Sequence, residues 1–360
     1  TYTGSVKGGP ESRGIYVARF DRSRGELTSP TLAAEVKNPS FLAKHPTQPR
    51  LYAVCMDDSS GEPTGAVAAF RIDTGQGLLG HLGNPPTGGP VPTGGKGPCH
   101  VCVDHRGKVV LAANYGGGSV VCLALADDGS IQPAARGTPG GFIQHAFDRK
   151  DTPGIDPRRQ EGPHAHSVDV SPDGRFAFVC DLGLDQVLIY RLDTARATLS
   201  PHGHATLPAG SGPRHFAMHP SGRFAWCINE LSLTVTGFTY DAEAGSLTTI
   251  ETLSTLPDDV IDRRGFTCAE IAVHPSGRFL YASTRGHDSI AMYRIDKSTG
   301  RLTFLGVEPT RAETPRHFAI APGGKFLLAA GQSSHNVTVF AIDEATGLIT
   351  FTGQSIEVPS

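Results

Sequence analysis

The sequence predicts an all-β fold, a seven-bladed β-propeller with four-stranded antiparallel blades that spans residues 1–360 as a single domain. One hairpin pattern, built around an Asp, occurs seven times. A second hairpin pattern, built around a Pro–Gly turn, occurs six times. Successive copies are spaced roughly fifty residues apart, which is the period of propeller blades. The 44 Gly and 27 Pro among 360 residues fit many short strands joined by turns.

The Asp pattern is an alternating apolar run, an Asp, a polar stretch that usually contains Gly, and a second apolar start. Two period-two runs around such a turn predict a β-hairpin. The seven copies are centred on Asp21, Asp73, Asp127, Asp193, Asp241, Asp296 and Asp343.

The Pro–Gly pattern alternates with the first and supplies the other hairpin of each blade. Pro presets φ at the second position of a turn and Gly tolerates positive φ, so these segments also predict hairpins. The turn positions are Pro46, His105 in place of Pro, Pro172, Pro220, Pro275 and Pro322. His45, His219 and His274 belong to these turns and are interpreted as structural.

Two segments depart from the repeat. Residues 2–36 are expected to form the outer strands of the seventh, closing blade, with the C-terminal run SIEVPS as its innermost strand, because closing the ring removes an exposed edge. Residues 132–163 are rich in Gly, Pro and charge without a strand pattern, and predict a long loop over one mouth of the channel.

Composition excludes several classes of function. The net charge of −3 provides no basic surface for nucleic acid, and no run of about eighteen apolar residues could span a membrane. The seven cysteines lack CxxC spacing and are interpreted as buried thiols. A cytoplasmic protein is therefore expected. The alternative is an export signal removed before Thr1, since the chain has no initiator Met.

Aligning the blades predicts which residues face the axis. Polar residues at the start of each first strand, and at the end of the second strand beside it, should converge near one mouth of the channel. The first set is Cys99, His166, Arg214 and Arg316, followed at the next position by His100, Ser167, His215, Glu270 and His317. The second set is Asn114, Tyr115, Asp181, Asn229, Glu230, Thr284, Arg285 and Gln332. Burying guanidinium groups without an anion is unfavourable, so these positions indicate an anionic ligand.

Several motifs at this level resemble the lactonase family of seven-bladed propellers. They are RQEGPHAHSVDVSPDGRF, the repeated PRHF at Arg214 and Arg316, the Asn229–Glu230 pair, ANYGGGSV, and RGHDSI beginning at Arg285. The similarity covers essentially the whole chain. That family includes one type of 6-phosphogluconolactonase and the fungal carboxymuconate lactonizing enzymes.

The resemblance implies a catalytic set of His166, Arg214, Glu230 and Arg285; the usual Asn before the RGH motif is Thr284 here. Arg214 or Arg316 would bind the anion, another Arg would face the ring carbonyl, and Glu230 or His166 would be the general base. The expected substrate-binding residues are His164, His100, Asn114, Tyr115, Asp181, His215, Asn229, Glu270, Arg316, His317 and Gln332.

The expected activity is hydrolysis of a sugar lactone, 6-phosphogluconolactone to 6-phosphogluconate. One alternative is the reverse chemistry, closure of a carboxymuconate to a lactone by a cycloisomerase. The other is a non-catalytic propeller that binds partners. No cofactor is expected. No metal is expected either, since the arginines near His164 and His166 would repel a cation. A monomer is expected because a closed propeller leaves no strand edge to pair.

Overall fold

The computed structural model describes residues 12–57, 64–83, 89–133, 141–148 and 156–359. The strands that it contains are numbered β1 to β29, and none of these residues forms a helix that could cross a membrane. The described residues divide into two compact units. Unit 1 contains residues 13–17 and 32–212, and unit 2 contains residues 12, 18–31 and 213–359.

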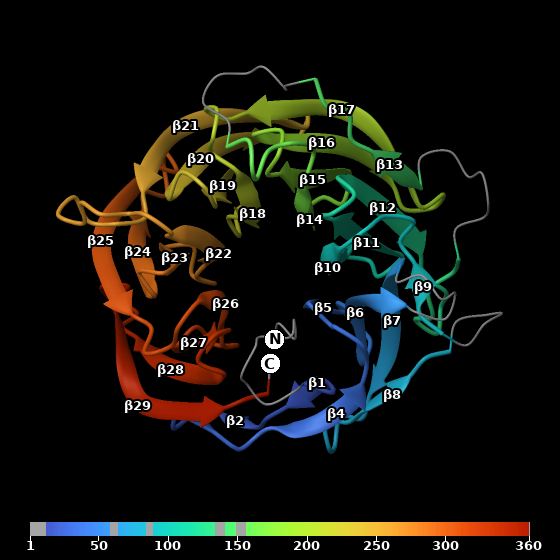
Figure 1. Ribbon diagram of the computed structural model, residues 1–360, viewed down its shortest axis with the longest axis horizontal. Helices are drawn as coiled ribbons and strands as arrows, with labels where there is room; N and C mark the ends of the chain where they lie inside the picture. Colours follow the sequence, from blue (N-terminus) through green and yellow to red (C-terminus); the bar gives the residue numbers. More distant parts are fainter. Residues whose placement is uncertain (1–11, 58–63, 84–88, 134–140, 149–155, 360) are drawn as a thin grey trace. The chain divides into compact units, whose positions relative to one another are not determined.

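Unit 1 contains three large antiparallel sheets whose strands lie side by side in chain order (Figure 1). The first contains β5 (Phe41–Lys44), β6 (Arg50–Asp57), β7 (Thr64–Ile72) and β8 (Leu79–His81), with β9 (Val91–Pro92) also paired to β7. The second contains β10 (Pro98–Val103), β11 (Val109–Asn114), β12 (Ser119–Ala124) and β13 (Phe142–Gln144). The third contains β14 (Ala165–Val170), β15 (Phe176–Asp181), β16 (Gln186–Asp193) and β17 (Thr198–Thr206).

Unit 2 contains three four-stranded antiparallel sheets of the same design. The first contains β18 (Pro213–Met218), β19 (Phe224–Asn229), β20 (Thr234–Asp241) and β21 (Ser246–Ser254). The second contains β22 (Thr267–Val273), β23 (Phe279–Arg285), β24 (Ser289–Ile295) and β25 (Leu302–Pro309). The third contains β26 (Pro315–Ile320), β27 (Phe326–Gly331), β28 (Asn336–Ile342) and β29 (Ile349–Glu357). The predicted pairing of two hairpins into one antiparallel sheet is therefore confirmed.

The two predicted turns have separate places in each sheet. The Pro–Gly turn joins the first strand to the second, and its Gly adopts positive φ, as at Gly174 (φ 74°) and Gly277 (φ 68°). The Asp turn joins the third strand to the fourth. In the turn at Asp296, the carboxylate Oδ1 accepts the backbone N–H groups of Ser298 at 2.8 Å and Thr299 at 2.9 Å. Such side-chain acceptors fix the turn and hence the hairpin register.

Six of the seven predicted Asp residues cap their turns in this way. They are Asp21, Asp73, Asp193, Asp241, Asp296 and Asp343. The assignment of Asp127 was wrong by one residue, because Asp128 Oδ1 accepts the N–H of Ser130 at 2.8 Å. This hairpin is irregular, with an isolated bridge from Leu125 to Ile131 in place of a continuous pair of strands.

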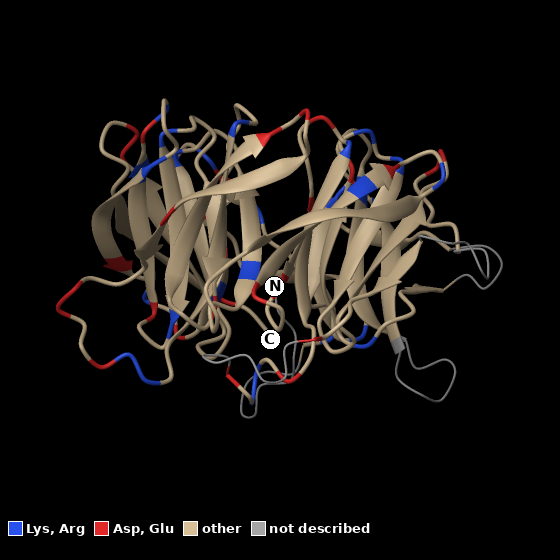
Figure 2. Cartoon of the chain, turned by 90° about the horizontal axis from the view of Figure 1, so that it is seen from above, with Lys and Arg blue, Asp and Glu red and all other residues tan. Residues whose placement is uncertain are grey.

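The core lies between neighbouring sheets within each unit. In unit 1, Val109, Leu111, Val168 and Val179 belong to one buried cluster, built from β11 and β14–β15. In unit 2, Trp226, Ile228, Leu280 and Tyr293 belong to another, built from β19 and β23–β24. Each fully buried apolar side chain of this size contributes about 1.5–3 kcal/mol. Charged residues gather instead in the turns and loops that join the strands (Figure 2).

Two expectations about the irregular segments were wrong. SIEVPS is not the first strand of a closing blade. Its residues Ser355, Ile356 and Glu357 pair with β28, so the run belongs to the fourth strand of the last sheet. The reason is the turn at Asp343, which directs the following residues back along β28. The segment 132–163 was expected to lack strands, yet it contains β13, which pairs with β12; its residues 134–140 and 149–155 lie outside the described residues.

The N-terminal segment contributes strands to both units. β1 (Gly14–Val17) pairs with β4 (Thr31–Glu35) in unit 1, and β2 (Phe20–Asp21) pairs with β3 (Glu26–Leu27) in unit 2. The residues TYTG of the predicted closing blade lie outside the described residues.

Candidate functional site

The predicted first level of polar residues coincides with a register shift that recurs in four of the sheets. The pairing of first and second strands shifts register between Pro98 and His100, Ala165 and Ser167, Pro213 and His215, and Pro315 and His317. The residues within these bulges are Cys99, His166, Arg214 and Arg316. A bulge turns a side chain away from the regular alternation of a strand and is common beside binding sites. The register therefore agrees with the alignment made from the sequence.

The predicted second level lies beside these bulges. Asn114 pairs with Pro98 and Asn229 pairs with Pro213, so Tyr115 and Glu230 immediately follow residues that face the start of a first strand. Arg285 ends β23 and pairs with Thr267, the first residue of β22. The sheets that contain a bulge thus present a bulge residue and a strand-end residue at the same edge.

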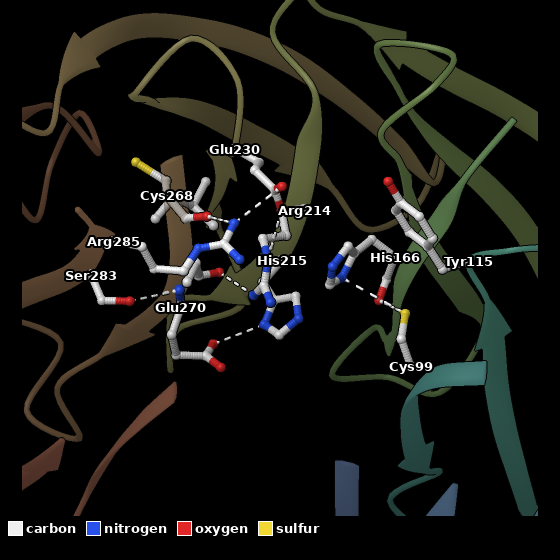
Figure 3. Close-up of polar contacts among 12 residues, drawn as sticks. Cys99, Tyr115, His166, Arg214, His215, Glu230, Cys268, Glu270, Ser283 and Arg285 are labelled. Atoms are coloured by element: carbon white, nitrogen blue, oxygen red, sulfur yellow. Dashed lines mark hydrogen bonds and ion pairs between the residues drawn. The ribbon is translucent and has the colours of Figure 1, made fainter. Parts of the chain in front are cut away.

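A buried ion-pair network occupies this edge in unit 2. Glu230 Oε2 accepts a hydrogen bond from Arg214 Nε at 3.0 Å, and Glu230 Oε1 lies 3.1 Å from Arg285 Nη2 (Figure 3). The side chains of Arg214, Glu230 and Arg285 are 2%, 4% and 13% exposed. The carboxylate therefore joins two guanidinium groups that come from neighbouring sheets.

The remaining donors of the two arginines are partly committed to the backbone. Arg214 Nη1 donates to the carbonyl of Ala269, and Arg285 Nη2 donates to that of Cys268 at 3.0 Å. Arg285 Nε is buried and has no hydrogen-bond partner among the described residues. Leaving such a donor unsatisfied is unfavourable by about 1–3 kcal/mol, so an acceptor atom supplied by a ligand would be stabilised here.

The network carries excess positive charge. Burial lowers the pKa of Arg214 to about 9, with the positive charges of Arg316 and Arg285 acting in the same direction and Glu230 opposing them. Arg214 is still protonated at neutral pH. Three guanidinium groups thus face two carboxylates, Glu230 and Glu270, an imbalance that favours an anion.

His215, Glu270 and His317 form a second group in unit 2. His215 Nδ1 donates to Glu270 Oε1 at 3.0 Å, and His317 Nε2 lies 3.2 Å from Glu270 Oε2. Burial lowers the pKa of His215 well below its ordinary value, and the neighbouring Arg214 lowers it further. His215 is therefore neutral, whereas the His317 side chain is 44% exposed.

Two other predicted residues of unit 2 are held in turns. Asn229 is fully buried, and its Nδ2 donates to Thr234 Oγ1 at 2.9 Å and Thr236 Oγ1 at 3.0 Å. The backbone N–H of Gln332 donates to the carbonyl of Thr314 at 3.0 Å. These two hydrogen bonds of Asn229 fix the turn between β19 and β20.

Unit 1 presents a different set at its corresponding edge. His166 is 4% exposed, and Cys99 Sγ donates to its backbone carbonyl at 3.1 Å (Figure 3). The Tyr115 ring stacks on His164 with centroids 4.6 Å apart and meets the His166 ring edge-on at 5.4 Å. Three of the predicted residues, His164, His166 and Tyr115, therefore lie together. The prediction that His166 acts with residues of unit 2 stays a prediction.

The remaining predicted residues of unit 1 make structural contacts. His100 Nδ1 accepts the N–H of Val168 at 3.3 Å, which links two sheets. Asn114 Nδ2 donates to Ser119 Oγ at 3.1 Å within its own hairpin. Asp181 Oδ1 accepts the N–H groups of His164 and Gly183, while its Oδ2 accepts from His145 Nδ1 at 2.6 Å.

One polar residue beside Tyr115 was missed by the sequence prediction. Arg159 Nη2 donates to Tyr115 Oη at 3.1 Å. Arg159 lies in the segment 132–163, which has no counterpart in the other blades, so alignment of the repeat could not have found it. The only signal was the general expectation that this segment is functional.

A metal centre receives no support from the geometry. Among the residues that the structure describes, no three His, Cys, Asp or Glu side chains form a group that could hold a metal ion. The chemistry that the arrangement offers is therefore anion binding by paired guanidinium groups in unit 2, and an imidazole–phenol group in unit 1.

Comparison with known proteins gives a match over the whole chain. The family model described as "Lactonase, 7-bladed beta-propeller" matches residues 1–360. A 6-phosphogluconolactonase of Bacillus subtilis is 34% identical over 319 residues, 88% of this chain and 82% of that protein. A 6-phosphogluconolactonase of Formosa agariphila is 31% identical, over 88% of this chain and 85% of that protein.

A solved structure extends the likeness to three dimensions. The periplasmic gluconolactonase of Pseudomonas aeruginosa superposes with a TM-score of 0.86 at 31% identity, covering 100% of this chain and 95% of that one. The fold is thus an all-β propeller with four-stranded antiparallel blades.

Proposed function

This chain belongs to the lactonase family of β-propellers, and we propose that it hydrolyses 6-phosphogluconolactone to 6-phosphogluconate. The observation that carries the proposal is the buried network of Arg214, Glu230 and Arg285. Hydrolysis of a lactone places negative charge on the carbonyl oxygen as water adds, and fixed positive donors stabilise that charge.

Arg285 is the proposed donor to the developing oxyanion. Its Nε is the buried donor that lacks a partner among the described residues. Arg214 and Arg316 supply the excess positive charge that an anionic substrate neutralises. Each charge-assisted hydrogen bond of this kind contributes about 1.5–3 kcal/mol.

Glu230 is proposed to position the two arginines rather than to accept a proton. Both of its oxygens face guanidinium donors, at 3.0 Å and 3.1 Å, and two cations stabilise the ionised carboxylate. A carboxylate held in this way is a poor base. The role of general base toward water is therefore assigned to His166, as one of the two candidates from the family resemblance.

The number of blades is proposed to be seven. Within unit 2, the glycine of one Asp turn packs on an aromatic ring of the preceding sheet, as a Cβ on Gly300 would lie 2.4 Å from Phe224. The hairpin β2–β3 repeats this contact, since a Cβ on Gly25 would lie 2.5 Å from Phe326. This repetition supports an additional blade that follows the sheet β26–β29.

The test compares lactones on wild type and variants. Wild type is assayed with 6-phosphogluconolactone, the unphosphorylated gluconolactone and a carboxymuconate. We expect hydrolysis of the phosphorylated lactone, with kcat about 100-fold to 1,000-fold lower in Arg285→Ala. Glu230→Gln should lower kcat as well, because it releases both arginines.

The control is Arg264→Ala, which removes an arginine whose side chain is 90% exposed and paired with Asp262 in the same unit. Its activity should equal that of wild type. Unchanged hydrolysis in Arg285→Ala would contradict the proposed site, and conversion of carboxymuconate alone would replace the lactonase by the cycloisomerase.

A further inference from the structure

Tyr115 is placed to meet a ligand at the edge of unit 1. It follows β11 directly, and its ring is held by stacking on His164 at 4.6 Å and by the edge of His166 at 5.4 Å. His164 Nδ1 also donates to the Tyr115 carbonyl at 3.0 Å. Tyr115 remains partly exposed, whereas His166 is buried. The phenol is therefore both fixed in orientation and accessible.

The hydroxyl of Tyr115 has an environment unlike that of the structural tyrosines. Tyr52, Tyr281 and Tyr293 each donate to a backbone carbonyl, at 2.9, 3.0 and 2.7 Å, and burial raises the pKa of all three. Tyr115 Oη instead accepts a hydrogen bond from the guanidinium of Arg159 at 3.1 Å. Because its oxygen accepts from a cation, the Tyr115 proton is the more readily given away.

Arg159 is held in place by its neighbour Gln160. Gln160 is fully buried, and its Nε2 donates to the carbonyl of Leu182 and to Asp185 Oδ1, both at 2.8 Å. Its Oε1 accepts the N–H of Asp156 at 2.9 Å. The segment that carries Arg159 is thereby fixed to the turn between β15 and β16.

Arg159 is the cation that contacts the Tyr115 hydroxyl directly. His164 Nδ1 donates to the Tyr115 carbonyl at 3.0 Å, and its Nε2 lies 3.2 Å from Glu161 Oε1. The loop that contains Lys96 packs on the Gly-rich turn after Tyr115, where Gly117 N–H donates to the Lys96 carbonyl. The titratable side chains that contact Tyr115 are Arg159, His164 and His166, and Glu161 lies beyond His164.

We propose that Tyr115 is the general acid of lactone hydrolysis and that Arg159 is a positioning residue acting through it. This inference rests on the proposed function. The general base takes a proton from water as the water oxygen bonds to the carbonyl carbon. The bond from that carbon to the ring oxygen then breaks, and the ring oxygen takes the Tyr115 proton. The protonated base then releases its proton to solvent, and the phenolate takes up a proton from solvent. The net reaction is lactone plus water to the hydroxy acid.

The first test removes the hydroxyl alone. Tyr115→Phe keeps the ring and its contacts with His164 and His166, so the folded state and KM should change little. We expect kcat to fall about 100-fold or more, the usual effect of losing a general acid. Tyr281→Phe is the matched control: it removes a buried hydroxyl bonded to a backbone carbonyl, and its kcat should equal that of wild type.

The second test is the pH profile of kcat, corrected for spontaneous lactone hydrolysis. A general acid must be protonated, so activity declines as pH rises through the pKa of Tyr115. Removing a nearby cation raises that pKa, and Arg159→Ala should therefore move the alkaline limb upward by about one pH unit while lowering kcat. Arg159→Lys should restore part of the shift. Arg158→Ala should leave the profile unchanged, because that side chain is 87% exposed and pairs with Asp156.

The outcomes separate this inference from the proposed function. If wild type hydrolyses the lactone but Tyr115→Phe keeps its kcat and its alkaline limb, Tyr115 is not the acid. If the limb stays in place in Arg159→Ala, Arg159 has no role through Tyr115. If wild type hydrolyses no lactone, both the function and the inference are overturned.

Discussion

Glu230 shows how the role proposed for one residue depends on its neighbours. The Asn229–Glu230 motif indicates a functional carboxylate, and a carboxylate in a cleft is a common general base. In unit 2 its two oxygens are shared between Arg214 and Arg285, at 3.0 and 3.1 Å. The Glu230 carboxylate that would accept a proton is already stabilised by the two guanidinium groups, so the geometry favours a positioning role for Glu230.

His215 gives a prediction about stability below neutral pH. Its pKa is well below the ordinary value of about 6.5 because it is buried beside Arg214. Between pH 6.5 and the lower folded-state pKa, the unfolded chain binds a proton that the folded chain does not. Stability must then fall with decreasing pH, by about 1.4 kcal/mol per unit for this one group, and level off below the folded-state pKa.

The measurement is the free energy of unfolding from denaturant titrations between pH 7 and pH 5. His215→Gln should reduce the pH slope by one proton relative to wild type. His204→Gln, at an exposed histidine of β17, should keep the wild-type slope. Equal slopes in wild type and His215→Gln would show that His215 is protonated in the folded protein.

Between elements, the histidines of the Pro–Gly turns link neighbouring sheets of the same unit. His219 Nδ1 accepts the N–H of Ser221 at 3.0 Å, and its Nε2 donates to the carbonyl of Gly277 in the next sheet at 2.9 Å. His274 makes the same contact with Gly324 at 2.8 Å. The interpretation of these histidines as structural agrees with this geometry, since both ring nitrogens of each are used.

This contact predicts different effects for two glycines at the same turn position. Both have positive φ, 74° at Gly174 and 68° at Gly277, so alanine is strained at either. A Cβ on Gly277 would also lie 2.5 Å from His219 Nε2, whereas a Cβ on Gly174 would meet nothing within 4 Å. We expect Gly174→Ala to lower stability by about 1 kcal/mol, and Gly277→Ala by at least twice as much.

Urea denaturation of the two variants tests this expectation, with His219→Ala Gly277→Ala as a third protein. The double variant removes the ring that the new Cβ would meet. Gly277→Ala should therefore lower the free energy of unfolding less in the His219→Ala background than in wild type. An equal decrease in the free energy of unfolding for Gly174→Ala and Gly277→Ala would show that the His219 ring moves aside without an energetic penalty.

The elements that could be predicted are those whose cause is local. An Asp that caps its own turn fixes a hairpin from the sequence alone, which is why six of seven Asp turns are where the pattern places them. β13 could not be predicted, because the Asp turn that follows β12 forms only the isolated bridge from Leu125 to Ile131, and β13 begins eleven residues after that bridge, at Phe142. The prediction for SIEVPS failed for a different reason. It relied on the expectation that the ends of the chain close the ring, although the local hairpin at Asp343 already indicates that these residues pair with β28.

At the scale of the whole chain, the repeat predicts which residues occupy equivalent positions in successive sheets, but it does not predict which side chains touch. Equivalent positions in successive sheets share a register, so Cys99, His166, Arg214 and Arg316 could be aligned before any coordinates. Which side chains then touch depends on packing between sheets. The bond from Arg159 to Tyr115 was beyond prediction for a second reason, since Arg159 lies in a segment without a repeat equivalent.

The seven cysteines are distributed over the sheets of both units and report on the packing of the molecule as a whole. All seven lie within the described residues and none is in a disulfide. Burial raises the pKa of the Cys102 and Cys122 thiols well above the usual range and that of Cys268 to about 11, so these thiols are poor nucleophiles. Cys99 and Cys102 are both partly exposed, and of the two Cys99 lies beside His166, whereas burial raises the pKa of Cys102; Cys99 is therefore expected to be the reactive thiol.

Titration with Ellman's reagent at pH 8 should therefore detect one rapidly reacting thiol in the native protein and seven in denaturant. Cys99→Ser should remove the rapid phase and leave six thiols after unfolding. A denatured count of five in wild type would reveal a disulfide, contrary to the structure. More than two rapid thiols in the native state would mean that the sheets open readily, because the five buried cysteines react only when the packing between strands is lost.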